Sequence, residues 1–374
     1  MLISKRIGFM VMVLVLVMAF FGWGCAPEEE PVKEPENGEP VEEPEETHTL
    51  HFATFWPDVD IMVQEGHHVW AEELEERTEG RVEVEFHYGG ALLGPAEIYE
   101  GVADGAADIG STCPSYTPGV FPVVESFELP GYDNQSALAA SKAVNEGVEE
   151  LMEDGHIDGF EDVKPLFFWA TGPGHLLTID PIEDLGDLQG TELRTTGGAT
   201  DTIESLGGVP VSAPMSEAYM SIETGVMEGI ISPYDVMRGF ELAELVDYAT
   251  ETDFLYNIVF MKVMNKDTFN ALPEDVQETI EEMNEEYVKE YGQVFDDSVM
   301  AGYEYGVDEH GVEIIELDEE EKERWEEEVK PVVQNHIEEM DGMGLPGEEI
   351  VETIEDKFSD YSAEYGEDYL EELR

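Results

Sequence analysis

The sequence predicts an α/β protein with two lobes. From residue 48 onward, short apolar runs alternate with amphipathic runs of helical period, which indicates β-α-β units with parallel strands and helices on the faces of the sheet. A second strand–helix series follows the first. A chain of 374 residues is also longer than one compact core usually holds. We therefore expect one lobe over residues 48–171 and a second over residues 172–254.

The first lobe begins with clear strand and helix signals. RVEVEFHY (81–88) alternates polar and apolar residues, which is the period of a half-buried strand. The other elements expected in this lobe are strands at 50–55, 106–112 and 163–171 and helices at 63–77 and 134–152.

The second lobe repeats the same unit. TELRTT (191–196) is expected to form a strand that leads into a helix at 199–206. The other elements expected here are strands at 175–180, 209–214 and 227–232 and a helix at 217–224.

Residues 255–310 are expected to connect the lobes. The apolar stretch 255–266 suits a strand that crosses between them, and residues 273–305 carry apolar side chains on one helical face. Such a helix would be about 50 Å long, enough to brace both lobes. Residues 311–374 are expected to form a strand at 311–317 and then acidic helices.

The N-terminus predicts export. Lys5 and Arg6 precede a long apolar run that ends just before Cys25, so residues 1–24 are interpreted as a signal peptide of the lipoprotein type. The small residues before Cys25 indicate cleavage there and acylation of its thiol, although a glycine stands where leucine is usual. An uncleaved anchor is the alternative. The Pro/Glu-rich residues 25–47 have little to bury and are expected to be a disordered tether, so the body would lie outside the cytoplasm, lipid-anchored to the outer face of the cytoplasmic membrane.

The charge of the chain excludes some partners. There are 89 acidic and 17 basic residues, a formal net charge of −72, and no basic patch that could attract nucleic acid or anionic lipid. Self-repulsion on this scale needs screening by counterions, which favours a saline habitat. An acidic surface that binds calcium or another cation is the alternative. If Cys25 is acylated, Cys113 has no partner for an intramolecular disulfide.

The sequence offers no positive argument for catalysis. His67 and His68 precede Glu72, but adjacent histidines on a helix point in different directions, and no metalloprotease or cysteine-cluster pattern accompanies them. Phosphate-binding loops and nucleophile motifs are also missing from the sequence. We therefore expect no catalytic residues, no metal and no cofactor. An exported metal-dependent hydrolase that uses one of these histidines remains an alternative.

Arg194 is the candidate for ligand binding. It lies in LRTTGG, near the end of an expected strand and just before a helix, where open α/β sheets bind ligands. A guanidinium group binds a carboxylate through two parallel hydrogen bonds. Gly197 and Gly198 would let the backbone approach that ligand closely. A structural salt bridge of Arg194 is the alternative.

A longer stretch around Arg194 resembles a known family. LQGTELRTTGGATDTIESLGGVPVSAPMSEAYMSIETGVMEGIISP is similar to the signature region of solute receptors of tripartite ATP-independent periplasmic (TRAP) transporters, the DctP family. EGRVEVEFHYGGALLGPAEIYEGVADGAADIG, LPEDVQETIEE and GVEIIELDEEE extend the resemblance over nearly all of residues 48–340.

The resemblance implies a periplasmic-binding-protein-like fold of two mixed sheets flanked by helices, with crossing strands, a long bracing helix and a ligand cleft between the lobes. It implies a receptor, not an enzyme, that binds a small organic acid by closure of the lobes. The acid would pass to a membrane permease of one small and one large subunit. A lipoprotein receptor of an ABC transporter would share this fold and is the alternative.

The resemblance also implies site residues. Arg194 falls on the family's carboxylate-binding arginine, and Thr195, Thr196, Met215 and Ser232 fall on positions that commonly line its pocket. The chain departs from the family in two places. GPGHL, with His175, replaces a second arginine, and IISPY lacks a common asparagine. Both departures favour a monocarboxylate over a dicarboxylate.

Five aromatic residues near expected strand ends could wall the pocket or lie in the core, and Trp56 is the strongest candidate among them. They are Phe55, Trp56, Tyr116, Trp169 and Tyr234.

Overall fold

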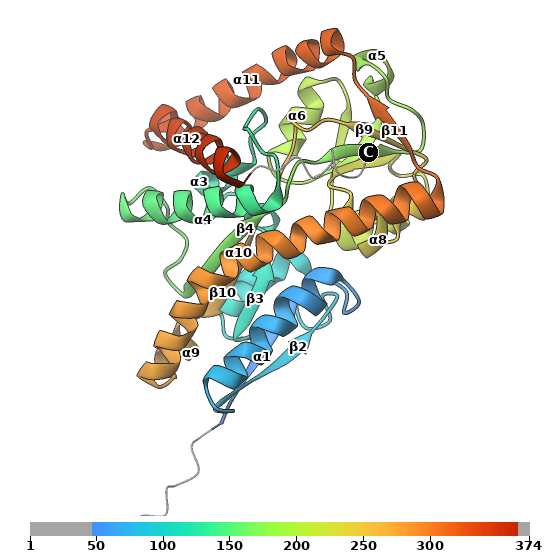
Figure 1. Cartoon of the computed structure of the whole chain (residues 1–374). Helices are drawn as coiled ribbons and strands as arrows, with labels where there is room; N and C mark the ends of the chain where they lie inside the picture. The colour runs from blue at the N-terminus through green and yellow to red at the C-terminus, as the bar shows by residue number, and fades with distance from the viewer. Residues whose placement is uncertain (1–46, 366–374) are drawn as a thin grey trace, which may run out of the picture. The chain divides into compact units, whose positions relative to one another are not determined.

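The computed structural model describes residues 47–365. The expected signal peptide, Cys25 and the tether up to residue 46 lie outside the described residues, as do the last nine residues of the chain. Two sheets organise the described part, as Figure 1 shows.

The first sheet has five strands in the order β2-β1-β3-β10-β4. Its strands are β1 (His48–Thr54), β2 (Val82–His87), β3 (Ile109–Thr112), β4 (Val163–Ala170) and β10 (Val259–Asn265). β1 pairs in parallel with β2 and β3, as the β-α-β pattern predicted. β10 lies antiparallel between β3 and β4, so this sheet is mixed.

The second sheet has six strands in the order β11-β9-β5-β8-β6-β7. Its strands are β5 (His175–Thr178), β6 (Glu192–Thr195), β7 (Val209–Ser212), β8 (Gly229–Ser232), β9 (Tyr248–Glu251) and β11 (Glu313–Glu316). β6 is parallel to β7 and β8, whereas β5 is antiparallel to β8 and β9. The sequence did not predict β9, because its four residues YATE carry no long apolar run.

Helices cover the first sheet where the amphipathic runs predicted them. α4 begins after Ser136, whose side chain accepts a hydrogen bond from the Ala139 N–H, and this cap satisfies one of the free donors of the first turn. The helix expected at 63–77 is a π-helical turn that continues into α1. The helical segments of this part are η1 (Met62–His67), α1 (His68–Arg77), η2 (Pro95–Glu97), α2 (Ile98–Ala103), η3 (Pro114–Tyr116), α3 (Pro122–Glu125), η4 (Ser126–Glu128), α4 (Ala137–Glu153) and α9 (Lys266–Ala271).

Shorter helices cover the second sheet. α8 directly follows β8, so it begins at the carboxyl end of that strand. The segments are α5 (Leu185–Leu188), α6 (Ala199–Ser205), η5 (Met215–Glu217), α7 (Ala218–Glu223), α8 (Asp235–Gly239), η6 (Leu242–Glu244) and η7 (Tyr305–His310).

The long helix α10 (Glu274–Glu304) contacts elements of both lobes. Its 31 residues span about 46 Å at ~1.5 Å per residue. It packs on α4 and β4 of the first lobe and on α8 of the second, and Figure 1 shows it crossing the molecule. At Gly302 the approach is close, because a Cβ there would lie 2.1 Å from the Tyr234 carbonyl oxygen.

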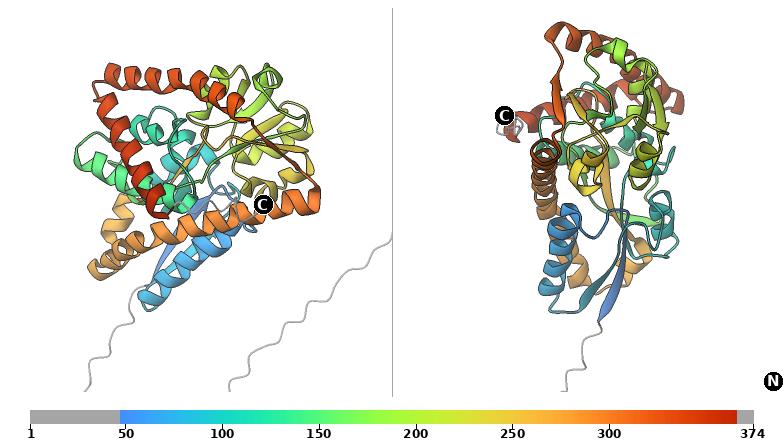
Figure 2. Two further views of the ribbon diagram at one scale, coloured as in Figure 1. Left: turned by 45° about the horizontal axis from the view of Figure 1, so that its top comes forward. Right: turned by 90° about the vertical axis from the view of Figure 1, so that its right-hand side faces the viewer.

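Two C-terminal helices complete the structure. α11 (Glu319–Met343) begins after Asp318, whose side chain accepts from the Glu321 N–H, and it packs on α6. α12 (Gly347–Tyr365) turns back and packs on α4; Figure 2 shows both helices from two further sides. These helices thus join the second lobe to the first.

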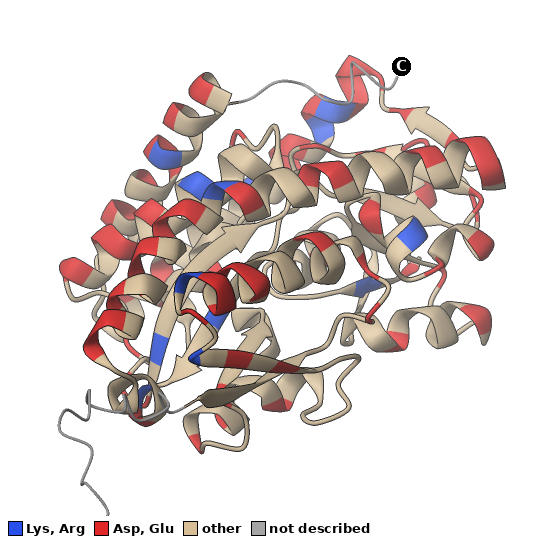
Figure 3. Ribbon diagram, turned by 60° about the horizontal axis from the view of Figure 1, so that its bottom comes forward, with Lys and Arg blue, Asp and Glu red and all other residues tan. Residues whose placement is uncertain are grey.

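Acidic residues lie on nearly every helix, and basic residues are few, as the coloured ribbon of Figure 3 shows. Within residues 47–365, no helix is both long enough and apolar enough to span a bilayer.

Candidate ligand-binding site

A cavity lies where segments of the two lobes meet, and it has a volume of about 30 Å³. From the first lobe it is lined by the residues after β1, by η3 and by β10. From the second lobe it is lined by β6, by η5 and by the β8–α8 connection. This volume is far below the range for small-molecule sites, so the two lobes would have to move apart to admit a ligand.

Arg194 lies at this cavity near the end of β6, with only 2% of its surface exposed. Its Nε donates to the Ala213 carbonyl oxygen at 2.8 Å, and its Nη2 donates to the Tyr116 hydroxyl at 3.3 Å. Within the described chain, Arg194 forms no ion pair with a carboxylate. The salt-bridge alternative therefore has no partner in residues 47–365, and a buried cation of this kind is costly unless an anion pairs with it.

Tyr116 joins the two lobes at the arginine. Its hydroxyl oxygen accepts from Arg194 Nη2 and from the Met215 N–H, the latter at 3.0 Å. Burial raises the pKa of Tyr116, so the phenol keeps its proton. Because both of these hydrogen bonds are accepted ones, the O–H hydrogen is left to donate to a further acceptor.

The two glycines of LRTTGG accommodate Glu128 and do not line the cavity. Gly197 has φ +55°, and a Cβ there would lie 1.9 Å from Glu128 Oε2. The other carboxyl oxygen, Oε1, accepts from the Val259 N–H at 3.1 Å. Burial raises the pKa of Glu128 to about 8, so near neutral pH this carboxyl is mostly protonated. Glu128 therefore does not serve as a counter-ion for Arg194.

Aromatic rings form the apolar wall of the cavity. Phe55 stacks on Trp56 with ring centroids 3.9 Å apart, and Trp56 lies 4.8 Å from Phe260. Tyr116 meets Phe55 edge-to-face at 5.5 Å. A ligand with an apolar body would contact these faces while its carboxylate met Arg194.

Asp235 is a second polar group at the cavity. It is the first residue of α8 and is buried, and its Oδ1 has no hydrogen-bond partner among the described residues. Burial and, secondarily, nearby Asp60 raise its pKa well above the ordinary value. Asp60 accepts from the Met62 N–H at 2.8 Å, and burial raises the pKa of Asp60 to about 6. Burial therefore favours the protonated form of the Asp235 carboxyl, which can donate a hydrogen bond into the cavity.

The structure brings some of the expected site residues together at this cavity. Those that line it are Phe55, Trp56, Tyr116, Arg194, Met215 and Ser232.

The other expected site residues lie outside the lining. Thr195 Oγ1 is 3.1 Å from Thr200 Oγ1, and Trp169 packs against Tyr291 in the core. His175 stacks on Tyr234 at 4.4 Å and borders a different hollow. Tyr234 and Thr196 also lie outside the lining. The buried hydroxyl of Thr196 has no hydrogen-bond partner in residues 47–365.

Several lining residues were not expected from the sequence. One signal could have found Asp235, because it is a lone acid within the apolar run SPYDVM. The additional lining residues are Thr171, Pro233, Asp235, Val236, Phe240, Tyr256, Ile258, Phe260 and Phe295.

The paired histidines on the first helix face different partners. His67 Nδ1 is 2.7 Å from the Tyr291 hydroxyl, and His68 Nε2 is 2.7 Å from the Tyr88 hydroxyl. Burial lowers the pKa of His67, so it is a neutral core residue.

Two lobes, each with a mixed sheet, and a cavity with a buried arginine between them define a solute-binding receptor. The family model for bacterial extracellular solute-binding proteins, family 7 (DctP), matches residues 52–340. The chain belongs to this family, and it is a TRAP solute-binding receptor, not an enzyme.

Solved structures share the fold. A TRAP solute-binding protein from Rhodoferax ferrireducens, in complex with copurified benzoate, is 28% identical with a TM-score of 0.80; the match covers 85% of this chain and 99% of that one. A marine metagenome TRAP solute-binding protein specific for aromatic acid ligands, in complex with 3-hydroxybenzoate, is 28% identical with a TM-score of 0.79; the match covers 84% of this chain and 99% of that one.

A solute-binding protein of Roseobacter denitrificans is 23% identical over 216 residues, which are 56% of this chain and 64% of that protein. The match thus spans less than two thirds of that relative.

Proposed function

We propose that this chain is an extracytoplasmic receptor for a small monocarboxylate with an aromatic or otherwise apolar body. Arg194 carries the proposal, because it is a buried cation at a cavity and has no carboxylate partner in the described chain. A ligand carboxylate would receive a guanidinium hydrogen bond from Arg194 and the hydroxyl hydrogen of Tyr116.

The walls of the cavity support a monocarboxylate. Among its lining residues Arg194 is the one with a full positive charge, and aromatic rings surround it. A second ligand carboxylate would meet Asp235 and lose its hydration without a cation in return. The relatives that bind benzoate and 3-hydroxybenzoate make an aromatic acid the leading candidate.

Asp235 adds a preference within this class. Its unpartnered Oδ1 would form a hydrogen bond with a ligand hydroxyl, because a buried polar atom without a partner destabilises the complex. We infer that a ring hydroxyl directed at α8 increases affinity.

Ligand capture would proceed by closure of the lobes. Residues of both lobes line the cavity, and the hydrogen bond from the Met215 N–H to Tyr116 spans them. Closure would remove water from the Arg194–carboxylate pair and strengthen it. The closed receptor would then deliver the acid to a TRAP permease of small and large membrane subunits.

Attachment to the membrane through acylated Cys25 remains a prediction, because Cys25 lies outside the described residues. Membership of the TRAP family argues against the ABC-type alternative.

The test is calorimetric binding of benzoate, 3-hydroxybenzoate and succinate, in high salt. Wild type should bind the monocarboxylates in preference to succinate, and Arg194→Ala should weaken binding by about 2–5 kcal/mol, as truncation of a buried charge partner does. Arg238→Ala, at an exposed position on α8, is the matched control and should bind as wild type does. Equal affinity of wild type and Arg194→Ala would refute the proposal.

A second variant tests the preference for a hydroxyl. Asp235→Ala should keep its affinity for benzoate within a few-fold and lose the preference for 3-hydroxybenzoate. An unchanged ratio of the two affinities would exclude Asp235 from ligand selection.

A further inference from the structure

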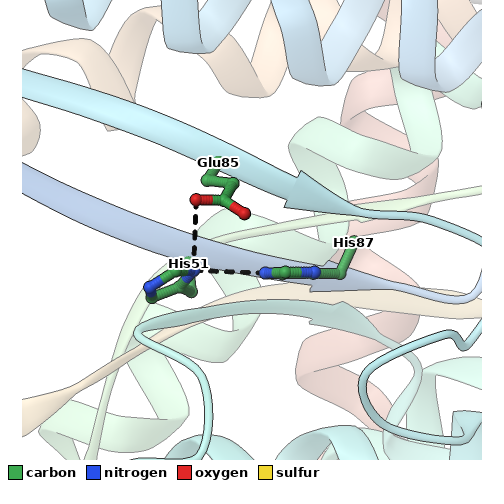
Figure 4. Close-up of side chains that lie close together, drawn as sticks. All are labelled: His51, Glu85 and His87. Carbon is green, nitrogen blue, oxygen red and sulfur yellow. Dashed lines mark hydrogen bonds and ion pairs between the residues drawn. The ribbon is translucent and has the colours of Figure 1, made fainter. Parts of the chain in front are cut away.

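Three potential metal ligands lie together on the first sheet, away from the ligand cavity. His51 projects from β1, and Glu85 and His87 project from β2, as Figure 4 shows. His51 and Glu85 are exposed and His87 is half-buried. None of the three lines the candidate ligand site.

The strand register brings these side chains to one face. His51 is paired directly with Glu85, and Ala53 is paired with His87. Because side chains alternate between the two faces of a strand, Glu85 and His87 point the same way, and His51 is their cross-strand neighbour. The backbone of His51 is held in place by the residue just before β3, since its N–H donates to Asp108 Oδ2 at 2.8 Å. The cluster therefore rests on paired strands and not on a flexible loop.

The distances suit one bound ion. His51 Nδ1 and His87 Nε2 are 3.2 Å apart, and two imidazole nitrogens on one tetrahedral Zn²⁺ are separated by about 3.3 Å at Zn–N distances of about 2.0–2.1 Å. Glu85 Oε2 lies 3.9 Å from His51 Nδ1, and the three ligand atoms all lie within 4.8 Å of one another. A change of side-chain torsion at exposed Glu85 brings its oxygen to the ion.

A hydrogen bond between the two histidines explains only part of this arrangement. One shared hydrogen satisfies the two facing nitrogens, but it does not involve the carboxylate of Glu85, which lies 3.9 Å from His51 Nδ1. A divalent cation satisfies all three groups at once. Two imidazoles with one carboxylate favour transition metals, whereas Ca²⁺ and Mg²⁺ prefer sites made wholly of oxygen.

We propose that His51, Glu85 and His87 bind one divalent transition-metal ion of the Zn²⁺ or Cu²⁺ type. The ion links edge strand β2 to β1, and its remaining coordination position faces solvent. The site is independent of the carboxylate cavity, so its occupancy changes the stability of the first sheet and leaves ligand affinity unaltered.

The first test is Zn²⁺ titration of the untagged, chelator-treated full chain, with excess Mg²⁺ present to saturate the carboxylates of the acidic surface. One Zn²⁺ should bind per chain and raise the thermal midpoint. His51→Ala and His87→Ala should each weaken this binding at least tenfold. His48→Ala is the matched control, because His48 lies on the same strand but on the opposite face, and it should bind Zn²⁺ as wild type does.

Cu²⁺ electron paramagnetic resonance gives an independent readout. Two coordinated imidazole nitrogens are expected in wild type and one in each single histidine variant. The proposal is overturned if Zn²⁺ binds no more tightly than Mg²⁺. It is also overturned if both histidine variants retain wild-type affinity, since the ion would then occupy other groups of the chain.

Discussion

The replacement Glu128→Gln should remove the contribution of one buried carboxyl group to the pH dependence of stability. Glu128 is buried where η4, β10 and the Gly197–Gly198 turn meet. Its Oε1 accepts from the Val259 N–H, and its Oε2 has no hydrogen-bond partner in the described chain. Glutamine has nearly the same shape and keeps the acceptor for Val259, but it cannot ionise.

The magnitude follows from the pKa. Burial raises the pKa of Glu128 from its ordinary value of 4.5 to about 8, and at about 1.36 kcal/mol per pKa unit this corresponds to roughly 5 kcal/mol. Between these two pH values the unfolded carboxyl is ionised while the folded one keeps its proton. The contribution of Glu128 to the free energy of unfolding is thus fully present below about pH 4.5 and is lost as the pH rises through about 8. Relative to Glu128→Gln, wild type should lose on the order of 5 kcal/mol across this window.

Guanidinium unfolding of both proteins at several pH values between about 4 and 9 measures this difference. Other titrating groups are the same in the two proteins, so their contributions cancel. Glu100→Gln, at an exposed position, controls for the loss of one carboxyl group from the surface. If the difference in unfolding free energy between wild type and Glu128→Gln does not change with pH, the reasoning about burial of Glu128 is wrong.

Three further outcomes are expected. Tyr116→Phe removes the acceptor shared by Arg194 and the Met215 N–H and should weaken benzoate binding by about 1–3 kcal/mol in calorimetry, whereas Tyr99→Phe, in the first lobe and outside the cavity lining, should not. Gly197→Ala should lower the thermal midpoint more than Gly80→Ala does. Both glycines have positive φ, but only at Gly197 would the new Cβ meet Glu128. Equal decreases of the midpoint would show that backbone strain alone destabilises both variants. Raising KCl from about 0.1 to about 1 M shortens the Debye length from ~10 to ~3 Å. This should raise the thermal unfolding midpoint, because the chain has a net charge of −72 and its carboxylates repel one another less. An unchanged midpoint would contradict the predicted need for screening of these charges.

The acidic surface and the buried acids respond to different conditions. Surface carboxylates repel one another through solvent and are sensitive to salt. Glu128, Asp60 and Asp235 are shielded from solvent, so pH and not salt should govern their contribution. Measuring the pH series in high salt separates the two effects.

The sequence by itself determined the α/β class, the order of most strands and helices, and the place of Arg194. These properties are local, because the spacing of apolar residues within a short segment distinguishes strands from helices. The position of Arg194 near a strand end could be predicted for the same reason, because strand, turn and helix follow one another within residues 191–206.

The tertiary structure decided which side chains meet. β10 inserts antiparallel into the first sheet, and no local period specifies that pairing. Asp235 faces the ligand cavity while its neighbour Tyr234 packs on His175, a choice made by the packing of α8 beneath α10. His51 and His87 lie 36 positions apart in the sequence, and their ring nitrogens are 3.2 Å apart because the register of β1 on β2 aligns them. Contacts of this kind depend on long-range pairing, which the period of a single segment does not encode.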